Sequence, residues 1–136
     1  MPYMPKRILV ADTSDSDRRL SAILAGHDVV FARTMGEAQR LLAQQQFDLV
    51  MIGVHFDDSR MFDLMRHVRA GGHHADKPVA CVRSHRFVSA AAISLEGLQI
   101  AARALACNLF LDLTRYPDDA HGNAEVRKLL DGLLTP

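Results

Sequence analysis

The stretch that decides the fold is Phe47-Asp48-Leu49-Val50-Met51-Ile52-Gly53-Val54. It is short and almost continuously apolar, which is typical of a strand that is covered on both faces of a parallel sheet. Further runs of the same kind lie at residues 8–11, 29–31, 79–82 and 109–111. We therefore expect five strands, near residues 7–12, 28–32, 48–54, 79–83 and 108–112.

Segments with helical periodicity separate these runs, because apolar residues recur in them three and four positions apart. Thr34 and Glu37 have capping-box spacing before the second segment, and Ser94 is a suitable N-cap before the fourth. The expected apolar stripes are Leu20, Ile23 and Leu24; Ala38, Leu41 and Leu42; Met61, Leu64, Met65 and Val68; Leu98, Ala101, Ala102 and Leu105; and Val126, Leu129, Leu130 and Leu133. Strands that alternate with helices predict an α/β fold, a three-layer sandwich with a parallel sheet between helices.

Length and charge narrow the possible functions. A chain of 136 residues is expected to form one domain over residues 1–136. Its 16 basic and 16 acidic residues cancel, so it lacks the charge imbalance of proteins that bind nucleic acid or anionic membranes. No apolar run approaches the roughly 20 residues of a membrane span, and the N-terminus has no signal-peptide pattern. Cys81 and Cys107 lie in apolar segments, which favours free thiols in a reducing compartment. We expect a cytoplasmic protein.

Ligands of such a sheet bind at the carboxyl ends of its strands. No glycine-rich dinucleotide loop, Walker loop or nucleophile elbow occurs in this sequence. His73 and His74 are adjacent in a glycine-containing loop, and the remaining histidines have no metal-ligand spacing. The residues expected at the strand ends are Asp12 and Thr13, Gly53 to Asp58, Arg83 and Ser84, and Leu113 and Thr114.

The whole pattern resembles the receiver domain of response regulators in two-component signalling, of which CheY-like proteins are examples. Four stretches carry the resemblance: RILVAD at 7–12, FDLVMI at 47–52, KPVACV at 77–82 and ALACNLFL at 104–111. The resemblance implies a flavodoxin-like (βα)5 sandwich with strand order 2-1-3-4-5. It also implies a place in phosphorelay signal transduction.

Receiver domains use a small set of side chains, and the resemblance indicates which residues of this chain take their positions. Two acids after the first strand and an acceptor aspartate after the third bind magnesium there; these positions hold Asp12, Thr13 and Gly53. A hydroxyl residue and a lysine contact the phosphoryl group; these positions hold Arg83 and Leu113. Because only Asp12 matches, we expect no phosphoacceptor, no catalytic residue, weak or absent magnesium binding and no other cofactor.

We expect a degenerate pocket formed by these five residues and Ser84. A shift of one residue in the alignment with the receiver pattern would put Ser84 at the hydroxyl position. Arg83 is long and permanently charged, and we hypothesise that it forms an ion pair with Asp12 in the space above Gly53. Such a pair would hold the switch in one conformation. Two aspartates of the next loop are expected at the pocket rim or in a solvated acidic turn: Asp57 and Asp58.

The connection between the fourth and fifth strands is longer than the receiver pattern implies. Three of its apolar residues are expected either to pack as an extra helical turn or to form a partner surface: Phe87, Val88 and Ile93. In receiver domains the fourth helix, fifth strand and fifth helix commonly mediate docking. The resemblance therefore implies a histidine kinase, an effector domain or a second copy of this chain as the partner at that face.

The function expected from the sequence is that of an atypical receiver, a pseudo-receiver that is not an enzyme. It would act as a phosphorylation-independent protein-interaction or regulatory module. Two alternatives stay open: a receiver switched by a ligand or by unusual phosphorylation, and a flavodoxin-like binder of a small ligand. The sequence also leaves open whether the chain is whole or part of a longer regulator.

Overall fold

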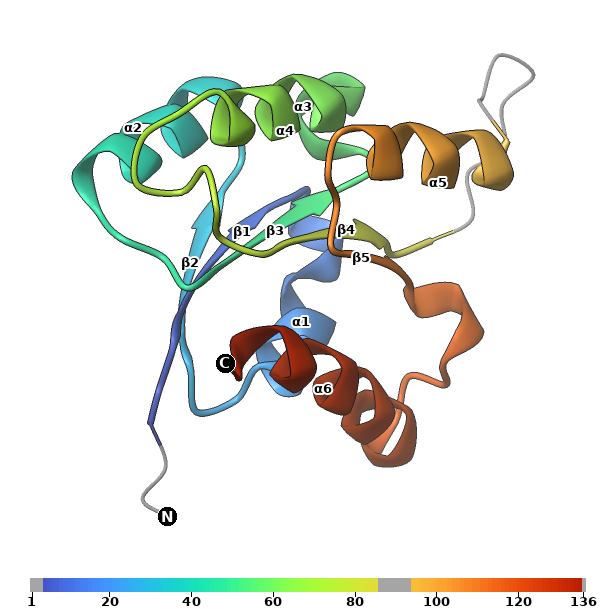
Figure 1. Ribbon diagram of the computed structural model, residues 1–136. Helices are drawn as coiled ribbons and strands as arrows, with labels where there is room; N and C mark the ends of the chain where they lie inside the picture. The colour runs from blue at the N-terminus through green and yellow to red at the C-terminus, as the bar shows by residue number, and fades with distance from the viewer. Residues whose placement is uncertain (1–3, 86–93, 136) are drawn as a thin grey trace.

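A single parallel sheet brings the carboxyl ends of the strands to one edge. The computed structural model describes residues 4–85 and 94–135. In it, β1 (Arg7–Ala11), β2 (Asp28–Ala32), β3 (Leu49–Gly53), β4 (Val79–Arg83) and β5 (Leu109–Asp112) pair in the order β2-β1-β3-β4-β5 (Figure 1). The predicted fold class and strand order are confirmed, and the strand ends lie within one residue of those expected.

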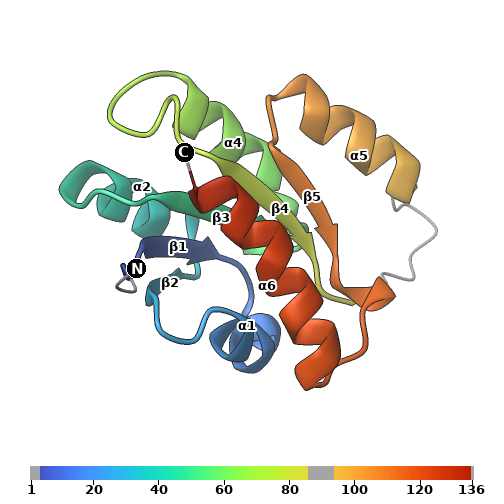
Figure 2. The same cartoon turned by 60° about the horizontal axis from the view of Figure 1, so that its bottom comes forward.

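Helices cover both faces of the sheet and make the predicted three layers. On one face lie α1 (Asp17–Ile23) and α6 (Ala120–Leu134), side by side in Figures 1 and 2. The other face carries α2 (Met35–Gln44), α4 (Met61–Arg69) and α5 (Leu95–Ala104). Three short elements complete the described chain: the 3-10 turns η1 (Ser14–Ser16) and η2 (Leu113–Arg115), and α3 (Phe56–Ser59).

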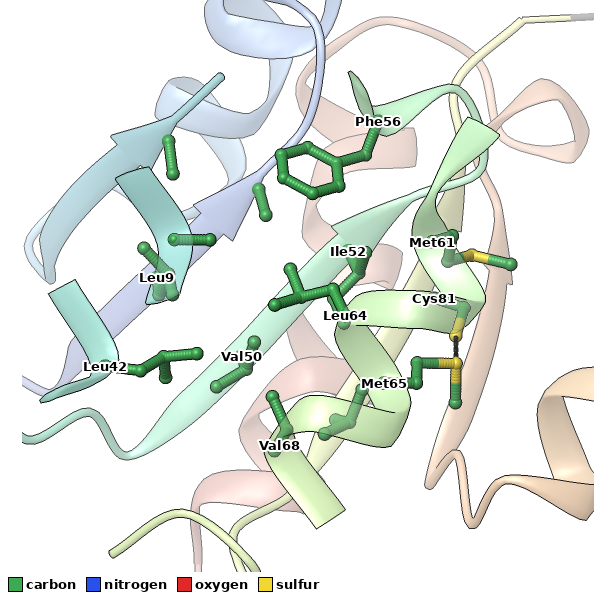
Figure 3. Close-up of a cluster of buried hydrophobic side chains, with 14 of the residues drawn as sticks. Leu9, Leu42, Val50, Ile52, Phe56, Met61, Leu64, Met65, Val68 and Cys81 are labelled. Carbon is green, nitrogen blue, oxygen red and sulfur yellow. Dashed lines mark hydrogen bonds between the residues drawn. The ribbon is translucent and has the colours of Figure 1, made fainter. Parts of the chain in front are cut away.

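Two apolar cores follow from the alternation of side chains along the strands. Central strand β3 is buried at all five positions, as a strand covered on both faces must be. Its Leu49 and Met51 pack toward α1 and α6, whereas Val50 and Ile52 pack toward α2 and α4 (Figure 3). The continuous apolar run therefore supplies both cores, and Gly53 ends it at the functional edge of the sheet.

The predicted helix signals are mostly confirmed. The Thr34 hydroxyl accepts a hydrogen bond from the Glu37 backbone N–H at 3.2 Å, and the Ser94 hydroxyl accepts one from Gly97 at 3.0 Å. The stripes of α1 and α4 are fully buried. Two stripes differ from the expectation: α5 buries only Ala102, and Leu129 of α6 is 40% exposed. These two helices thus retain apolar surface that the sheet does not cover.

Two arginines, Arg19 and Arg127, join α1 and α6 to neighbouring segments through hydrogen bonds to backbone carbonyl oxygens. Arg19 of α1 donates to the carbonyl oxygens of Leu113, Tyr116 and Pro117, at distances of 2.9 to 3.0 Å. Arg127 of α6 donates to carbonyl oxygens at the end of α1. The partners of Arg19 lie 94 to 98 residues away, so no local sequence pattern indicates these contacts. Within the described residues, no helix has both the length and the apolar character that a membrane crossing needs.

Candidate functional site

Asp12 is the buried acid of the strand-end site, which we define as Asp12, Thr13, Gly53, Arg83, Ser84 and Leu113. It directly follows β1 and is only 2% exposed. Its carboxylate accepts hydrogen bonds from the Ser16 hydroxyl and the Thr13 backbone N–H, each at 2.8 Å. Burial raises the pKa of Asp12 above its ordinary value of 3.8, against the effects of these bonds and of nearby positive charge. Asp12 is therefore a desolvated carboxyl group held on both oxygens.

Gly53 lies directly beneath that carboxyl group. Strands β1 and β3 pair up to Ala11 and Ile52, so the next residues of each strand emerge side by side. A Cβ placed on Gly53 would lie 1.9 Å from Oδ1 and 2.1 Å from Cγ of Asp12. These separations are far below van der Waals contact. The Asp12 carboxyl group thus occupies the volume that the first side-chain atom at position 53 would need.

Arg83 does not fill that volume, and the hypothesis of an Arg83–Asp12 ion pair is wrong. Its guanidinium contacts Asp112 at 3.0 Å and the Thr114 hydroxyl at 3.4 Å. The reason is the register of the sheet: β4 and β5 are neighbours, and Arg83 lies opposite Asp112. Burial acts to raise the pKa of Asp112, but hydrogen bonds from Thr114 and the Arg83 charge outweigh it and lower the pKa.

The remaining residues of the site are Thr13, Ser84 and Leu113, which carry no charge. Thr13 is half-buried, and its hydroxyl oxygen is enclosed without a hydrogen-bond partner among the described residues. Ser84 is half-buried at the exit of β4. Leu113 is fully buried and packs with Val126 and Leu130 of α6, so its side chain belongs to the core.

The loop after β3 contains two aspartates, Asp57 and Asp58. Asp57, Asp58 and Ser59 all have left-handed backbones, with φ of 43°, 55° and 65°. The Asp57 carboxylate accepts a hydrogen bond from the Met35 backbone N–H at 2.8 Å and so caps α2. Asp57 is therefore engaged at the start of α2, and Asp58 is exposed to solvent.

Sequence reasoning missed three contacts at the site. Ser16 holds Asp12 from the following turn, and Arg33 after β2 donates to the Asp12 carbonyl oxygen at 3.1 Å. The rings of His55 and His85 stack with centroids 4.6 Å apart, and burial together with nearby positive charge lowers the pKa of His55. The Asp12-to-Ser16 spacing of four residues was a usable signal, since a turn brings such positions together. The other two contacts join separate loops and left no local pattern.

The residues present do not fit the magnesium site of a receiver domain. Magnesium prefers several carboxylate and water oxygens in near-octahedral arrangement. Here both oxygens of Asp12 already accept hydrogen bonds, and Gly53 supplies no ligand. Within residues 4–85 and 94–135, no three His, Cys, Asp or Glu side chains are grouped so as to hold a metal ion.

The histidine pair of the loop before β4 lies at the other end of the sheet. His74 is 4% exposed, and its Nε2 accepts a hydrogen bond from the Phe47 backbone N–H at 3.0 Å. It therefore holds the start of β3 in place. The residues singled out as a possible partner surface, Phe87, Val88 and Ile93, lie outside the described residues.

Among known proteins, this chain is similar to solved structures. No protein-family model matches the chain, and no curated protein matches its sequence. Solved structures do match over nearly the whole length. A response regulator from Thermotoga maritima shares 17% identity over 98% of this chain and 100% of its own, with a TM-score of 0.73.

Two further matches have the same character. Chemotaxis protein CheY4 from Vibrio cholerae shares 19% identity over 97% of this chain and all of its own, with a TM-score of 0.72. The receiver domain of a sensor histidine kinase from Pseudomonas aeruginosa, described with a magnesium ion in its active-site cleft, shares 18% identity, covering 96% of this chain and 98% of its own, with a TM-score of 0.70. The chain therefore has the CheY-like fold of response-regulator receiver domains.

Proposed function

We propose that this chain is an atypical receiver domain that acts by binding a protein partner, independently of aspartate phosphorylation. The observation that carries the proposal is the Asp12 carboxyl group over Gly53. Where a receiver would use a carboxylate nucleophile on the third strand, this chain has no side chain. The Asp12 carboxyl group occupies the space that this side chain would need.

Among the described residues, no other side chain supplies the groups that phosphoryl capture needs. A phosphoacceptor must present a free, ionised carboxylate oxygen to the phosphorus atom. Asp12 is desolvated, both of its oxygens accept hydrogen bonds, and its pKa is raised by burial. Transfer also needs cations that stabilise the developing charge. Leu113 is buried in the core, and Arg83 is neutralised by Asp112.

Uncovered apolar side chains support a binding role for the face formed by α5, β5 and α6. Ile100 of α5 is 62% exposed and Leu129 of α6 is 40% exposed. Helix α5 as a whole buries only Ala102, although its sequence is rich in apolar residues. Contiguous exposed apolar patches mark protein interaction sites, and we propose that these side chains belong to one. The partner classes we propose are a histidine kinase, an effector domain or a second copy of the chain.

Incubation with acetyl phosphate and magnesium chloride tests the chemical half of this proposal, with intact mass as the readout. We expect no phosphate adduct, while a receiver domain that retains its acceptor aspartate serves as the positive control. A stoichiometric adduct would overturn the proposal. Gly53→Asp is expected to stay unmodified as well, because Asp12, Thr13 and Leu113 remain. Robust magnesium-dependent phosphorylation of that variant would show that the site positions are wrongly assigned.

The binding half is tested by charge at the exposed apolar position of α5. Ile100→Asp should weaken partner capture or self-association, measured by quantitative affinity capture and sedimentation velocity, without lowering the unfolding midpoint. Met4→Asp is the matched control, because Met4 is an exposed apolar residue of a different segment at 70% exposure. Equal effects of the two substitutions, or a dependence on acetyl phosphate, would count against the proposed surface and mode of action.

A further inference from the structure

Two free thiols lie on the apolar side of the sheet that faces α4. Cys81 of β4 is fully buried, and Cys107 is half-buried in the turn between α5 and β5. The Cys81 thiol contacts the Met65 sulfur at 3.5 Å (Figure 3). Cys107 Sγ lies 3.0 Å from the Leu109 carbonyl oxygen and 3.8 Å from that of Val79, two residues before Cys81 on the same strand. Both thiols thus belong to one apolar cluster.

Arg69 holds the turn that carries Cys107. One guanidinium nitrogen donates to the Ala106 carbonyl oxygen at 2.7 Å and to Asn108 Oδ1 at 2.9 Å, on either side of Cys107. Its Nε atom is buried and has no hydrogen-bond partner among the described residues. Ala106 has a left-handed backbone with φ of 64°, which costs a residue with a Cβ roughly 1 kcal/mol or more. Cys107 therefore lies in a strained turn beside a fixed positive charge.

We propose that Cys107 and Cys81 form an oxidisable thiol pair, in which Cys107 reacts first with a peroxide and Cys81 then closes an intramolecular disulfide. The two cysteines belong neither to the strand-end site nor to the exposed apolar positions Ile100 and Leu129. Two free cysteines beside a cation make a site of thiol modification, whereas a buried cysteine alone would be inert.

The electrostatics assign the order of reaction. The interaction with the Cys81 thiol and the Arg69 charge lower the pKa of Cys107 to about 7, although burial opposes this. The same interaction with Cys107, together with burial, raises the pKa of Cys81. Cys107 is also the more exposed of the two. It is therefore the thiol that peroxide reaches in its reactive, ionised form.

The reaction balances with a peroxide as the oxidant. The Cys107 thiolate attacks one peroxide oxygen, the O–O bond breaks, and a sulfenic acid and hydroxide form. Cys81 sulfur then attacks the sulfenic sulfur, and the departing hydroxide leaves as water with the thiol proton. In sum, two thiols lose two electrons and two protons to hydrogen peroxide, giving one disulfide and two water molecules. Cys81 pairs across the sheet with Phe110, three residues beyond Cys107, so closing the bond requires the turn that carries Cys107 to shift.

The test counts thiols in the full chain before and after hydrogen peroxide, using N-ethylmaleimide under denaturing conditions and intact mass. We expect two alkylated thiols in the reduced protein and none after peroxide, with loss of two hydrogen atoms and recovery by a reductant. Two alkylated thiols after peroxide, or a disulfide-linked dimer on a non-reducing gel, would overturn the proposal.

Variants separate the roles of the two cysteines and of Arg69. Cys107→Ser should leave Cys81 alkylatable after peroxide, while Cys81→Ser should leave a Cys107 sulfenic acid that dimedone traps. Arg69→Gln should shift the pH profile of Cys107 alkylation upward and slow it several-fold near neutral pH, with Arg69→Lys partly restoring it. A Cys107→Ser protein that loses its remaining thiol at the wild-type rate would refute the assigned order.

Discussion

Gly53→Ala adds one methyl group at the point where β3 meets the Asp12 carboxyl group. The new carbon would lie 1.9 Å from Oδ1, 2.1 Å from Cγ and 2.5 Å from Oδ2 of Asp12. Since all three atoms belong to one side chain, we expect Asp12 to rotate away while the strands keep their register. The rotation breaks the hydrogen bonds from Ser16 and Thr13.

The size of the effect follows from these contacts. Two hydrogen bonds at about 1 to 1.5 kcal/mol each are lost. Replacing glycine in a strand regains about 0.5 to 1 kcal/mol, and rehydration of the carboxylate recovers a further part. We therefore expect Gly53→Ala to destabilise the fold by about 1 to 2 kcal/mol. In an Asp12→Ala background the obstacle is gone, so the same change should stabilise by about 0.5 kcal/mol.

Urea unfolding followed by far-ultraviolet circular dichroism measures the four proteins of this double-mutant cycle. We expect a coupling free energy of about 2 kcal/mol between positions 12 and 53. Gly36→Ala is the matched control, because nothing lies within 4 Å of a Cβ at this helix position. It should stabilise the protein by about 0.5 to 1 kcal/mol.

Additive effects at positions 12 and 53, within about 0.5 kcal/mol, would refute the reasoning. So would a Gly53→Ala protein that gains as much stability as Gly36→Ala. Either result would mean that the Asp12 carboxyl group does not occupy the space above the glycine. The proposal that the phosphoacceptor position is blocked would then lose its main support.

Other predictions concern charges that the structure places in defined environments. Arg19→Ala should lower the free energy of unfolding in urea by about 2 to 3 kcal/mol. The control is Arg18→Ala, which should cost less than about 0.5 kcal/mol because the Arg18 side chain is 75% exposed. Equal losses would contradict the contacts of Arg19. The pKa of Asp12 is raised in the folded state, so the free energy of unfolding should fall as pH rises from 3.8 through that folded pKa. Asp12→Asn should flatten this pH dependence of the urea midpoint. An unchanged pH dependence would contradict the raised pKa of Asp12. The Arg83–Asp112 pair should show a coupling of about 1.5 kcal/mol in a double-mutant cycle by urea unfolding, and no measurable coupling would place the pair in solvent.

Local patterns were sufficient for the architecture. The apolar run around Leu49 and the four runs like it predicted each strand to within one residue. Thr34 and Ser94 predicted two helix starts, because a capping hydroxyl acts within three residues of its own position. The third strand also ended at Gly53, as expected.

The candidate site was predictable in its membership more than in its contacts. Asp12, Gly53 and Arg83 do emerge at one edge of the sheet, since parallel strands end together. The partner of Arg83 was not predictable from charge alone, because two aspartates lay within plausible reach. Sheet order decided in favour of Asp112, which is opposite Arg83 on the neighbouring strand. For Asp57, the capping partner Met35 lies 22 residues away.

The sequence by itself determined the alternation of strands and helices and the absence of a side chain at position 53, because both are properties of local residue order. Only the tertiary structure decided what fills the space above that glycine. Side-chain volume is shared between strands, and the pairing of β1 with β3 brings Asp12 over Gly53 while the pairing of β4 with β5 draws Arg83 to Asp112. These contacts join residues far apart in the chain, so they arise only when the sheet has formed.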